Sequence, residues 1–173
     1  DFKILGSPQP DFIYGLQNTV SYRNWNLDFF FQGTYGNEVF NSLTQTAFFG
    51  RAERTKYAET VNRWTLDNPN SDIPRAGAVA GLSEVKNNSK EIEDGTHLRL
   101  KSLRLSYGLP VQKWGWSQFK NLNLYFSGTN LFILSNFKLK DPESSMFGRS
   151  NVALGFSHGE YPSARVLSIG IKG

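Results

Sequence analysis

Several features that would assign this sequence to a common class are missing from it. Its 173 residues include no cysteine, which excludes a disulfide scaffold, a thiolate nucleophile and a zinc–thiolate site. No run of about 18 apolar residues occurs, so the sequence predicts no transmembrane helix. A membrane barrel is not excluded by this, because barrel strands alternate and give a far weaker hydropathy signal than helices.

Blocks of like charge are also missing. The net charge is +4, and the basic residues are scattered, which favours solvated loops and strand ends over a nucleic-acid-binding surface. The start, Asp1-Phe2-Lys3, is no signal peptide and lacks an initiating methionine. We therefore expect the sequence to be a piece of a longer protein.

Aromatic residues and glycine are plentiful, and they occur in alternating runs. Aromatics make up 14% of the sequence, which contains 16 glycines, as expected of a sheet with one apolar and one polar face. Alternation predicts five strands, at about residues 16–22, 27–35, 96–109, 121–133 and 163–173. The polar turn 23–26 joins the first two as a hairpin. Phe30 breaks the alternation, and we expect it to pack against an element on the lumenal side.

The connections between these strands alternate in length. Short connections lie at 23–26 and near 111–120, and long ones at about 36–95 and 134–162, the first with two possible helices around 37–48 and 52–63. Outer-membrane barrels have short periplasmic turns and long outer loops. The pattern predicts an all-β fold, the strands of a large antiparallel transmembrane barrel whose last strand ends on the periplasmic side.

The alternation also predicts which side chains face lipid and which lie at the membrane surface. In the strand at 96–109 the parity inverts near its start, where Leu98 and Leu100 oppose Arg99 and Lys101, and we interpret this as an outward face that turns charged where the strand leaves the hydrocarbon. Trp25, Trp114 and Trp116 are candidate interface aromatics, and an aromatic cluster on a soluble sheet is the alternative. The lipid-facing candidates are Leu27, Phe29, Phe31, Leu103, Leu105, Tyr107, Leu122, Leu124, Phe126, Leu167, Ile169 and Ile171.

Five separated motifs occur in order along most of the chain. They are Pro8-x-Pro10-Asp11-Phe12-x-Tyr14-Gly15-Leu16-x-Asn18 followed by Tyr22, Leu27 and Gly33; Arg63-Trp64-Thr65 with Asn68-Pro69 and Ile73-Pro74-Arg75; Ile92-Glu93-Asp94-Gly95-x-x-Leu98-Arg99-Leu100-Lys101 running into Leu105-x-Tyr107-x-Leu109-Pro110; Gly128-x-Asn130-Leu131-Phe132 followed by Asp141-Pro142-Glu143; and Tyr161-Pro162. In these motifs and their order the chain resembles the SusC/RagA-type TonB-linked outer-membrane proteins of the Bacteroidetes.

The resemblance implies a nutrient importer of the outer membrane, of which this chain is the C-terminal barrel portion. Such barrels have about 22 strands and a plugged lumen. Its implied partners are a SusD-like surface lipoprotein, the TonB complex through an N-terminal part absent from this chain, the lipid bilayer, and an oligosaccharide or peptide cargo. Barrels of the family commonly end on an aromatic residue, whereas this sequence ends on Lys172-Gly173, so we expect a short tail to follow.

No catalytic, cofactor or metal site is predicted. His97 and His158 have no acidic or cysteine cluster beside them, and residues 67–72 lack the glycine and glutamate of a calcium loop. A hydrolytic enzyme would need a pair such as Glu93 and Asp94, but neighbours on a strand face opposite ways.

Two alternatives remain open from the sequence. Trp64 and Arg75 are candidate contacts to cargo or partner, although their motifs could equally lock the long loop. The rival function is a soluble β-sandwich that binds carbohydrate through exposed Trp and Tyr.

Overall fold

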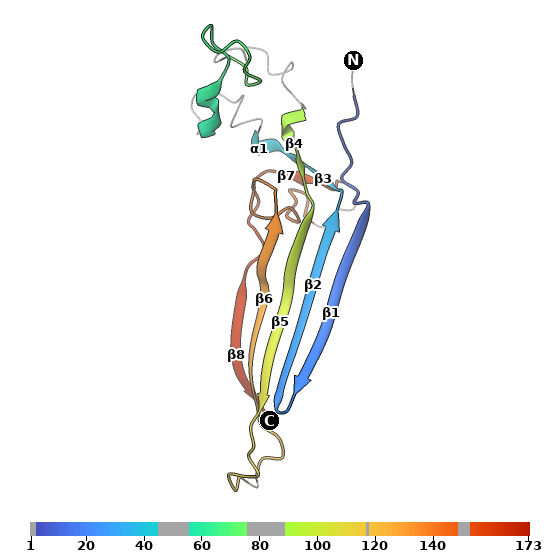
Figure 1. The fold of residues 1–173 in the computed structure, drawn as a ribbon, viewed down its shortest axis with the longest axis vertical. Helices are drawn as coiled ribbons and strands as arrows, with labels where there is room; N and C mark the ends of the chain where they lie inside the picture. Colours follow the sequence, from blue (N-terminus) through green and yellow to red (C-terminus); the bar gives the residue numbers. More distant parts are fainter. Residues whose placement is uncertain (1–2, 45–55, 76–88, 117, 149–152) are drawn as a thin grey trace.

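Five long strands form a single antiparallel sheet, and this confirms the predicted all-β fold (Figure 1). The computed structural model describes residues 3–44, 56–75, 89–116, 118–148 and 153–173. The strand order in the sheet is β1-β2-β5-β6-β8, so each strand lies beside the next long strand along the chain. The strands are β1 (Phe12–Tyr22), β2 (Trp25–Tyr35), β5 (His97–Gly108), β6 (Asn123–Ser135) and β8 (Val166–Lys172).

The strand boundaries differ from the predicted ones where a local signal was weaker than strand pairing. β1 begins at Phe12, directly after the two prolines, rather than at residue 16. The predicted turn 23–26 is wrong over Trp25 and Asn26, which pair with Tyr22 and Ser21 as the start of β2. The turn is only Arg23-Asn24, and Arg23 has the positive φ of +54° that a tight hairpin needs.

A second, three-stranded sheet lies beyond one end of the first, in the order β4-β3-β7. It consists of β3 (Glu38–Asn41), β4 (Ile92–Asp94) and β7 (Phe156–Ser157), with the short helices α1 (Ser42–Thr44), η2 (Ala58–Asn62) and η3 (Ser89–Glu91) nearby. The predicted helix around 37–48 is wrong over 38–41, which form β3, and its last residues lie outside the described ranges. Of the helix predicted around 52–63, the described part is helical only over Ala58–Asn62, as a 3₁₀ turn.

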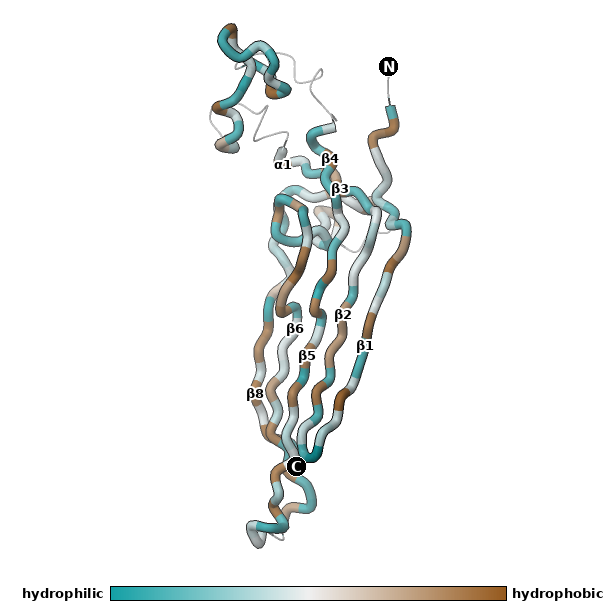
Figure 2. The backbone as a smooth tube through the Cα atoms, in the orientation of Figure 1, coloured by the Kyte–Doolittle hydropathy of each residue, from teal (hydrophilic) through white to brown (hydrophobic). Residues whose placement is uncertain are grey.

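The long connections leave the five-stranded sheet at one end and the short ones at the other, where the C-terminus also lies (Figure 1). Hydropathy alternates along each strand (Figure 2). The buried apolar side chains of the described residues (Val39, Ile73, Leu100, Val111 and Phe137) belong mostly to the connections. Within the ranges that the structure describes, no helix has the length and apolar character needed to cross a membrane.

A pair of adjacent bulges explains the inverted parity at the start of β5. Leu103 pairs with Phe29 and Leu100 pairs with Phe31, so Lys101 is an extra residue between them. The bulge keeps Leu98 and Leu100 on the same face as Leu103, and it keeps Arg99 on the opposite, polar face. The interpretation that the outward face turns charged here is therefore wrong.

β6 has a matching irregularity at the same height. Ser102 pairs with Thr129 and Leu100 with Phe132, which leaves Asn130 and Leu131 opposite Lys101. Asn130 adopts a φ of +52° at this point. β6 continues through this bulge to Ser135, two residues beyond the predicted end of the strand at 133.

Candidate functional site

One face of the five-stranded sheet collects the apolar side chains, and we call it the outward face. The strand registers place on it every lipid-facing candidate except Leu122, which precedes β6. β8 contributes Leu167, Ile169 and Ile171, which pair with Gly128, Phe126 and Leu124 of β6. Ile169 is 76% exposed, so these side chains have no covering layer among the described residues.

Aromatic rings border this face at both ends. At the short-turn end, the rings of Trp25 and Tyr107 lie 4.7 Å apart, and at the loop end those of Phe12 and Tyr35 lie 5.1 Å apart. Trp25 and Tyr35 are the two ends of the 11-residue β2. At about 3.3 Å per residue they are roughly 33 Å apart along the strand, which a tilt of about 40° reduces to a height of about 25 Å.

The other predicted interface aromatics lie beyond the sheet. Trp114 and Trp116 belong to the connection between β5 and β6, both are about half exposed, and their rings meet edge to face at 5.7 Å. They thus lie at the short-turn end, the end at which Trp25 begins β2.

The opposite face, here the inner face, is polar. Thr19 donates a hydrogen bond to Asp28 across β1 and β2 at 2.7 Å. The guanidinium of Arg104 lies 4.6 Å from the centre of the Tyr125 ring, and that ring covers Gly170, where a Cβ would lie 2.5 Å from its hydroxyl. Phe30 also lies on this face, over Gly15 of β1, and this partly explains its break in alternation.

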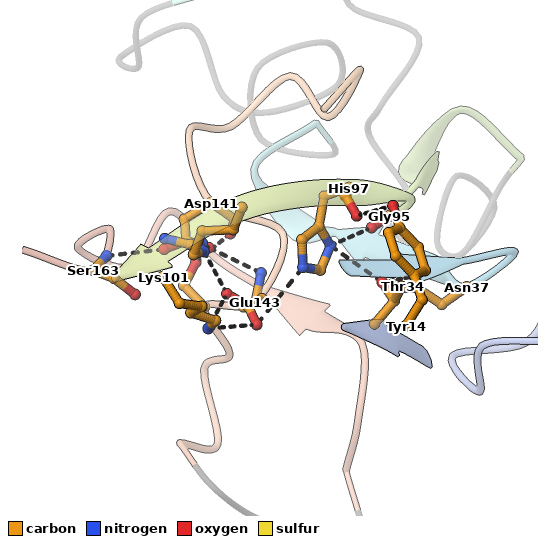
Figure 3. Close-up of polar contacts among 11 residues, drawn as sticks. Tyr14, Thr34, Asn37, Gly95, His97, Lys101, Asp141, Glu143 and Ser163 are labelled. Atoms are coloured by element: carbon orange, nitrogen blue, oxygen red, sulfur yellow. Dashed lines mark hydrogen bonds and ion pairs between the residues drawn. The ribbon is translucent and has the colours of Figure 1, made fainter. Parts of the chain in front are cut away.

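At the loop end the inner face bears a cluster of five ionisable side chains (Figure 3). His97, Arg99 and Lys101 come from β5, and Asp141 and Glu143 come from the β6–β8 connection. Arg99 forms ion pairs with both carboxylates, and the Arg99 and Asp141 side chains are only 3% and 2% exposed. Lys101 Nζ lies 2.8 Å from Glu143 Oε2. We refer to these five residues as the ion cluster.

His97 is buried within the ion cluster. Its Nδ1 lies 3.0 Å from the carbonyl oxygen of Gly95 and 3.2 Å from Thr34 Oγ1. Nε2 faces Glu143 Oε1 at 3.6 Å. The other histidine, His158, is exposed and its Nδ1 lies 2.6 Å from Ser42 Oγ. Within the described ranges no group of His, Cys, Asp and Glu has the arrangement of a metal site.

Both carboxylates of the cluster are held in their ionised forms. Burial opposes ionisation of Glu143, but hydrogen bonds from His97 and Lys101 and the charges of Arg99 and Lys101 outweigh it and lower the pKa of Glu143 to about 2. Burial likewise opposes ionisation of Asp141, and there the amides of Ser163 and Glu143 together with Arg99 hold the pKa below its usual range.

Trp64 and Arg75 lie together in an open hollow of about 470 Å³, lined also by Ser71, Asp72 and Pro74. The same motifs make local bonds. The Trp64 amide donates to the Ile73 carbonyl at 2.7 Å, and Asn68 donates to the carbonyl of Asn62 at 3.0 Å. Both roles left open by the sequence are thus compatible with this geometry.

Sequence reasoning missed the ion cluster, although it singled out both of its halves. Arg99 and Lys101 belong to one motif and Asp141-Pro142-Glu143 to another, and the paired residues are 42 positions apart. The opposite charges and equal spacing of the two motifs were the signal that could have joined them. The sequence showed no acidic residues beside His97, and the fold brings Glu143 to this buried side chain from another segment of the chain.

The fold and the comparisons with known proteins agree on a class. Over its whole length the chain is homologous to the TonB-dependent receptors, the class that includes the SusC/RagA type, and proteins of this class reside in the bacterial outer membrane. The chain is 48% identical over 175 residues to TonB-dependent receptor P26 of Formosa agariphila and 34% identical over 176 residues to TonB-dependent receptor P3 of that organism. Each alignment covers 99% of the chain, which spans 18% and 17% of these relatives. No protein-family model matches.

Solved structures show the same fold. The chain superposes with a TM-score of 0.78 on the RagAB peptide importer in its closed-closed state and of 0.75 on its open-open state, at 24% identity in both cases. The match covers 98% of the chain and 18% of the importer chain. The solved structures thus show that the chain shares the fold of this importer's barrel, and the sequence relatives bear out the TonB-dependent class that the motifs indicated.

Proposed function

We propose that this chain forms part of the barrel wall of a TonB-dependent nutrient importer in the outer membrane. The observation that carries the proposal is the outward face, an apolar band between two aromatic borders separated by about 25 Å, which is the height of the lipid-facing band of outer-membrane barrels. A soluble sandwich would cover this face with a second sheet, and the described residues contain none that does so.

The orientation of the wall follows from the connections. Short turns of outer-membrane barrels face the periplasm and long loops face outward. Arg23-Asn24 and the 109–122 connection are then periplasmic, while β3, β4, β7 and the ion cluster lie on the extracellular side. The outward face contacts lipid, and the polar inner face lines the lumen.

The partners follow from the same assignment. The importer draws energy from TonB and works with a SusD-like surface lipoprotein at its extracellular end, in keeping with its structural likeness to the RagAB peptide importer. Its cargo is an oligosaccharide or a peptide. Transport needs no chemistry on the cargo, since the wall supplies only a lipid-facing exterior and a polar passage.

Gene deletion in the source bacterium tests the proposal. We expect the deletion strain to lose growth on one set of glycans or of peptides, and the full-length gene to restore it only when TonB is functional. Growth on a panel of both cargo classes also decides between them. Unchanged growth on the whole panel, or recovery of the protein in the soluble fraction without detergent, would refute the proposal.

A further inference from the structure

The β6–β8 connection bends over the inner face of the sheet instead of extending freely beyond it. His97, Arg99 and Lys101 reach the inner face together because the bulge at Lys101 resets the phase of β5. Asp141 and Glu143 lie directly against them. The near-complete burial of Arg99 and Asp141 shows that the connection seals this contact from solvent.

Hydrogen bonds also join the two ends of the connection where it leaves and re-enters the sheet. The Ser163 amide donates to Asp141 Oδ2 at 2.9 Å, so one carboxylate joins the outgoing and returning parts of the connection. The Asn130 side-chain amide donates to the carbonyl of Ala164 at 3.1 Å, which attaches the returning part to the bulge of β6. Two bulges and one carboxylate thus hold both ends of the connection on the wall.

Further contacts fix the connection to the small sheet. The Lys138 amide donates to Glu93 Oε2 at 3.0 Å, and Phe156 pairs with Phe40 as β7 joins β3. The Phe147 ring packs edge to face on Phe156 at 5.7 Å, while Met146 and Phe147 remain about half exposed. The connection therefore holds an apolar tip in a fixed position.

We propose that residues 136–148 form a rigid shelf across the extracellular mouth of the channel and set the size of solute that can enter, with Arg99 and Asp141 as its positioning residues. This rests on the proposed function, because only a barrel wall gives the inner face a lumen to narrow. The charges of Arg99 and Lys101 balance those of Asp141 and Glu143. Separating these buried ion pairs would leave an unpaired charge in the protein interior, which is strongly destabilising. The ion pairs consequently hold the shelf in place on the wall.

The test compares solute sizes in cells that carry the full-length importer. Arg99→Met removes both ion pairs at similar side-chain volume. The matched control is Thr19→Val, which breaks the hydrogen bond to Asp28 on the same inner face. We expect Arg99→Met to lower the inhibitory concentration of a bulky glycopeptide antibiotic at least tenfold, with entry of a small sugar unchanged. Thr19→Val should change neither, and Arg99→Lys should lie between wild type and Arg99→Met.

Assembly is checked by the amount of importer in the outer membrane and by its heat-modifiable gel mobility. If Arg99→Met does not assemble, the milder Glu143→Gln decides the question with the same two solutes. An assembled variant with unchanged antibiotic entry overturns the shelf, and so does equal gain for the small solute. Cargo-dependent growth of the wild-type strain is measured alongside, and its absence would count against the proposed function and not against the shelf.

Discussion

An arginine placed at successive outward positions of β5 should destabilise the barrel in proportion to its depth in the membrane. Leu103, Leu105 and Tyr107 pair with Phe29, Leu27 and Trp25 of β2. Trp25 and Tyr35 mark the two borders of the band, so its midplane lies near the middle of β2. Counting about 3.3 Å per residue and a tilt of about 40°, the three positions lie roughly 2–3, 7–8 and 12–13 Å from that midplane.

The expected costs follow from these depths. An arginine at the midplane of an outer-membrane barrel costs about 2–4 kcal/mol, falling to about 0–1 kcal/mol at the borders. We expect Leu103→Arg to lie in the first range, Tyr107→Arg in the second and Leu105→Arg between them. The matched control is Ser102→Arg, one residue away on the inner face, where the guanidinium meets a polar lumen and should cost under about 1 kcal/mol.

The assay is the guanidinium unfolding midpoint of the full-length importer in phospholipid vesicles, with outer-membrane abundance as a cellular check. The order Leu103, Leu105, Tyr107 is the decisive result, because loss of packing alone would not follow depth. Equal costs at all three positions, or a larger cost at Ser102, would refute the assignment of the outward face to lipid.

Three further predictions concern the ion cluster and the strand backbone. The pKa of Glu143 is lowered from 4.5 to about 2, so the ionised side chain stabilises the folded state by roughly 3 kcal/mol at most. This stabilisation is complete above about pH 4.5 and is lost as the pH falls toward 2. The difference in unfolding midpoint between wild type and Glu143→Gln should therefore shrink over that window, and a constant difference would contradict the prediction. Because Lys101 is the extra residue of the bulge, deleting it leaves a regular β2–β5 ladder in which Arg99 stays on the inner face, so both the deletion and Lys101→Ala should assemble in the outer membrane. Failure of the deletion alone would show that the bulge itself is required for assembly. Gly33→Ala drives a methyl group into the carbonyl of His97 and should cost about 1–3 kcal/mol, while Gly108→Ala, whose Cβ would lie 3.5 Å from Asn123 Oδ1, should cost less in the same unfolding assay.

Much of the sheet could be predicted because alternation is a local property of the chain. Leu27, Phe29 and Phe31 fall on one face whatever their partners are, since successive side chains of a strand point to opposite sides. The long segments were also correctly separated from the strands. The short strands β3, β4 and β7 were missed because strands of two to four residues are too short for a periodicity to appear.

The candidate site could be predicted only in part. The apolar face followed from period two, whereas the interface role of the tryptophans stays a prediction from their composition and their place between strands. The ion cluster did not, because the partner of Arg99 is 42 residues away along the chain and no local pattern gives that distance. A buried arginine beside leucines was instead interpreted as an exposed strand end.

By itself the sequence determined the class of this protein: alternating strands, connections of alternating length, and ordered motifs of the SusC/RagA type. Only the tertiary structure decided on which side of the wall Arg99 lies, because a bulge is defined by the partner strand and shifts every residue beyond it by one position. The same shift gathers His97, Arg99 and Lys101 under the returning loop. Local periodicity fixes the faces within a strand, whereas the phase across a bulge and the ion pairs that depend on it exist only once the strands are paired.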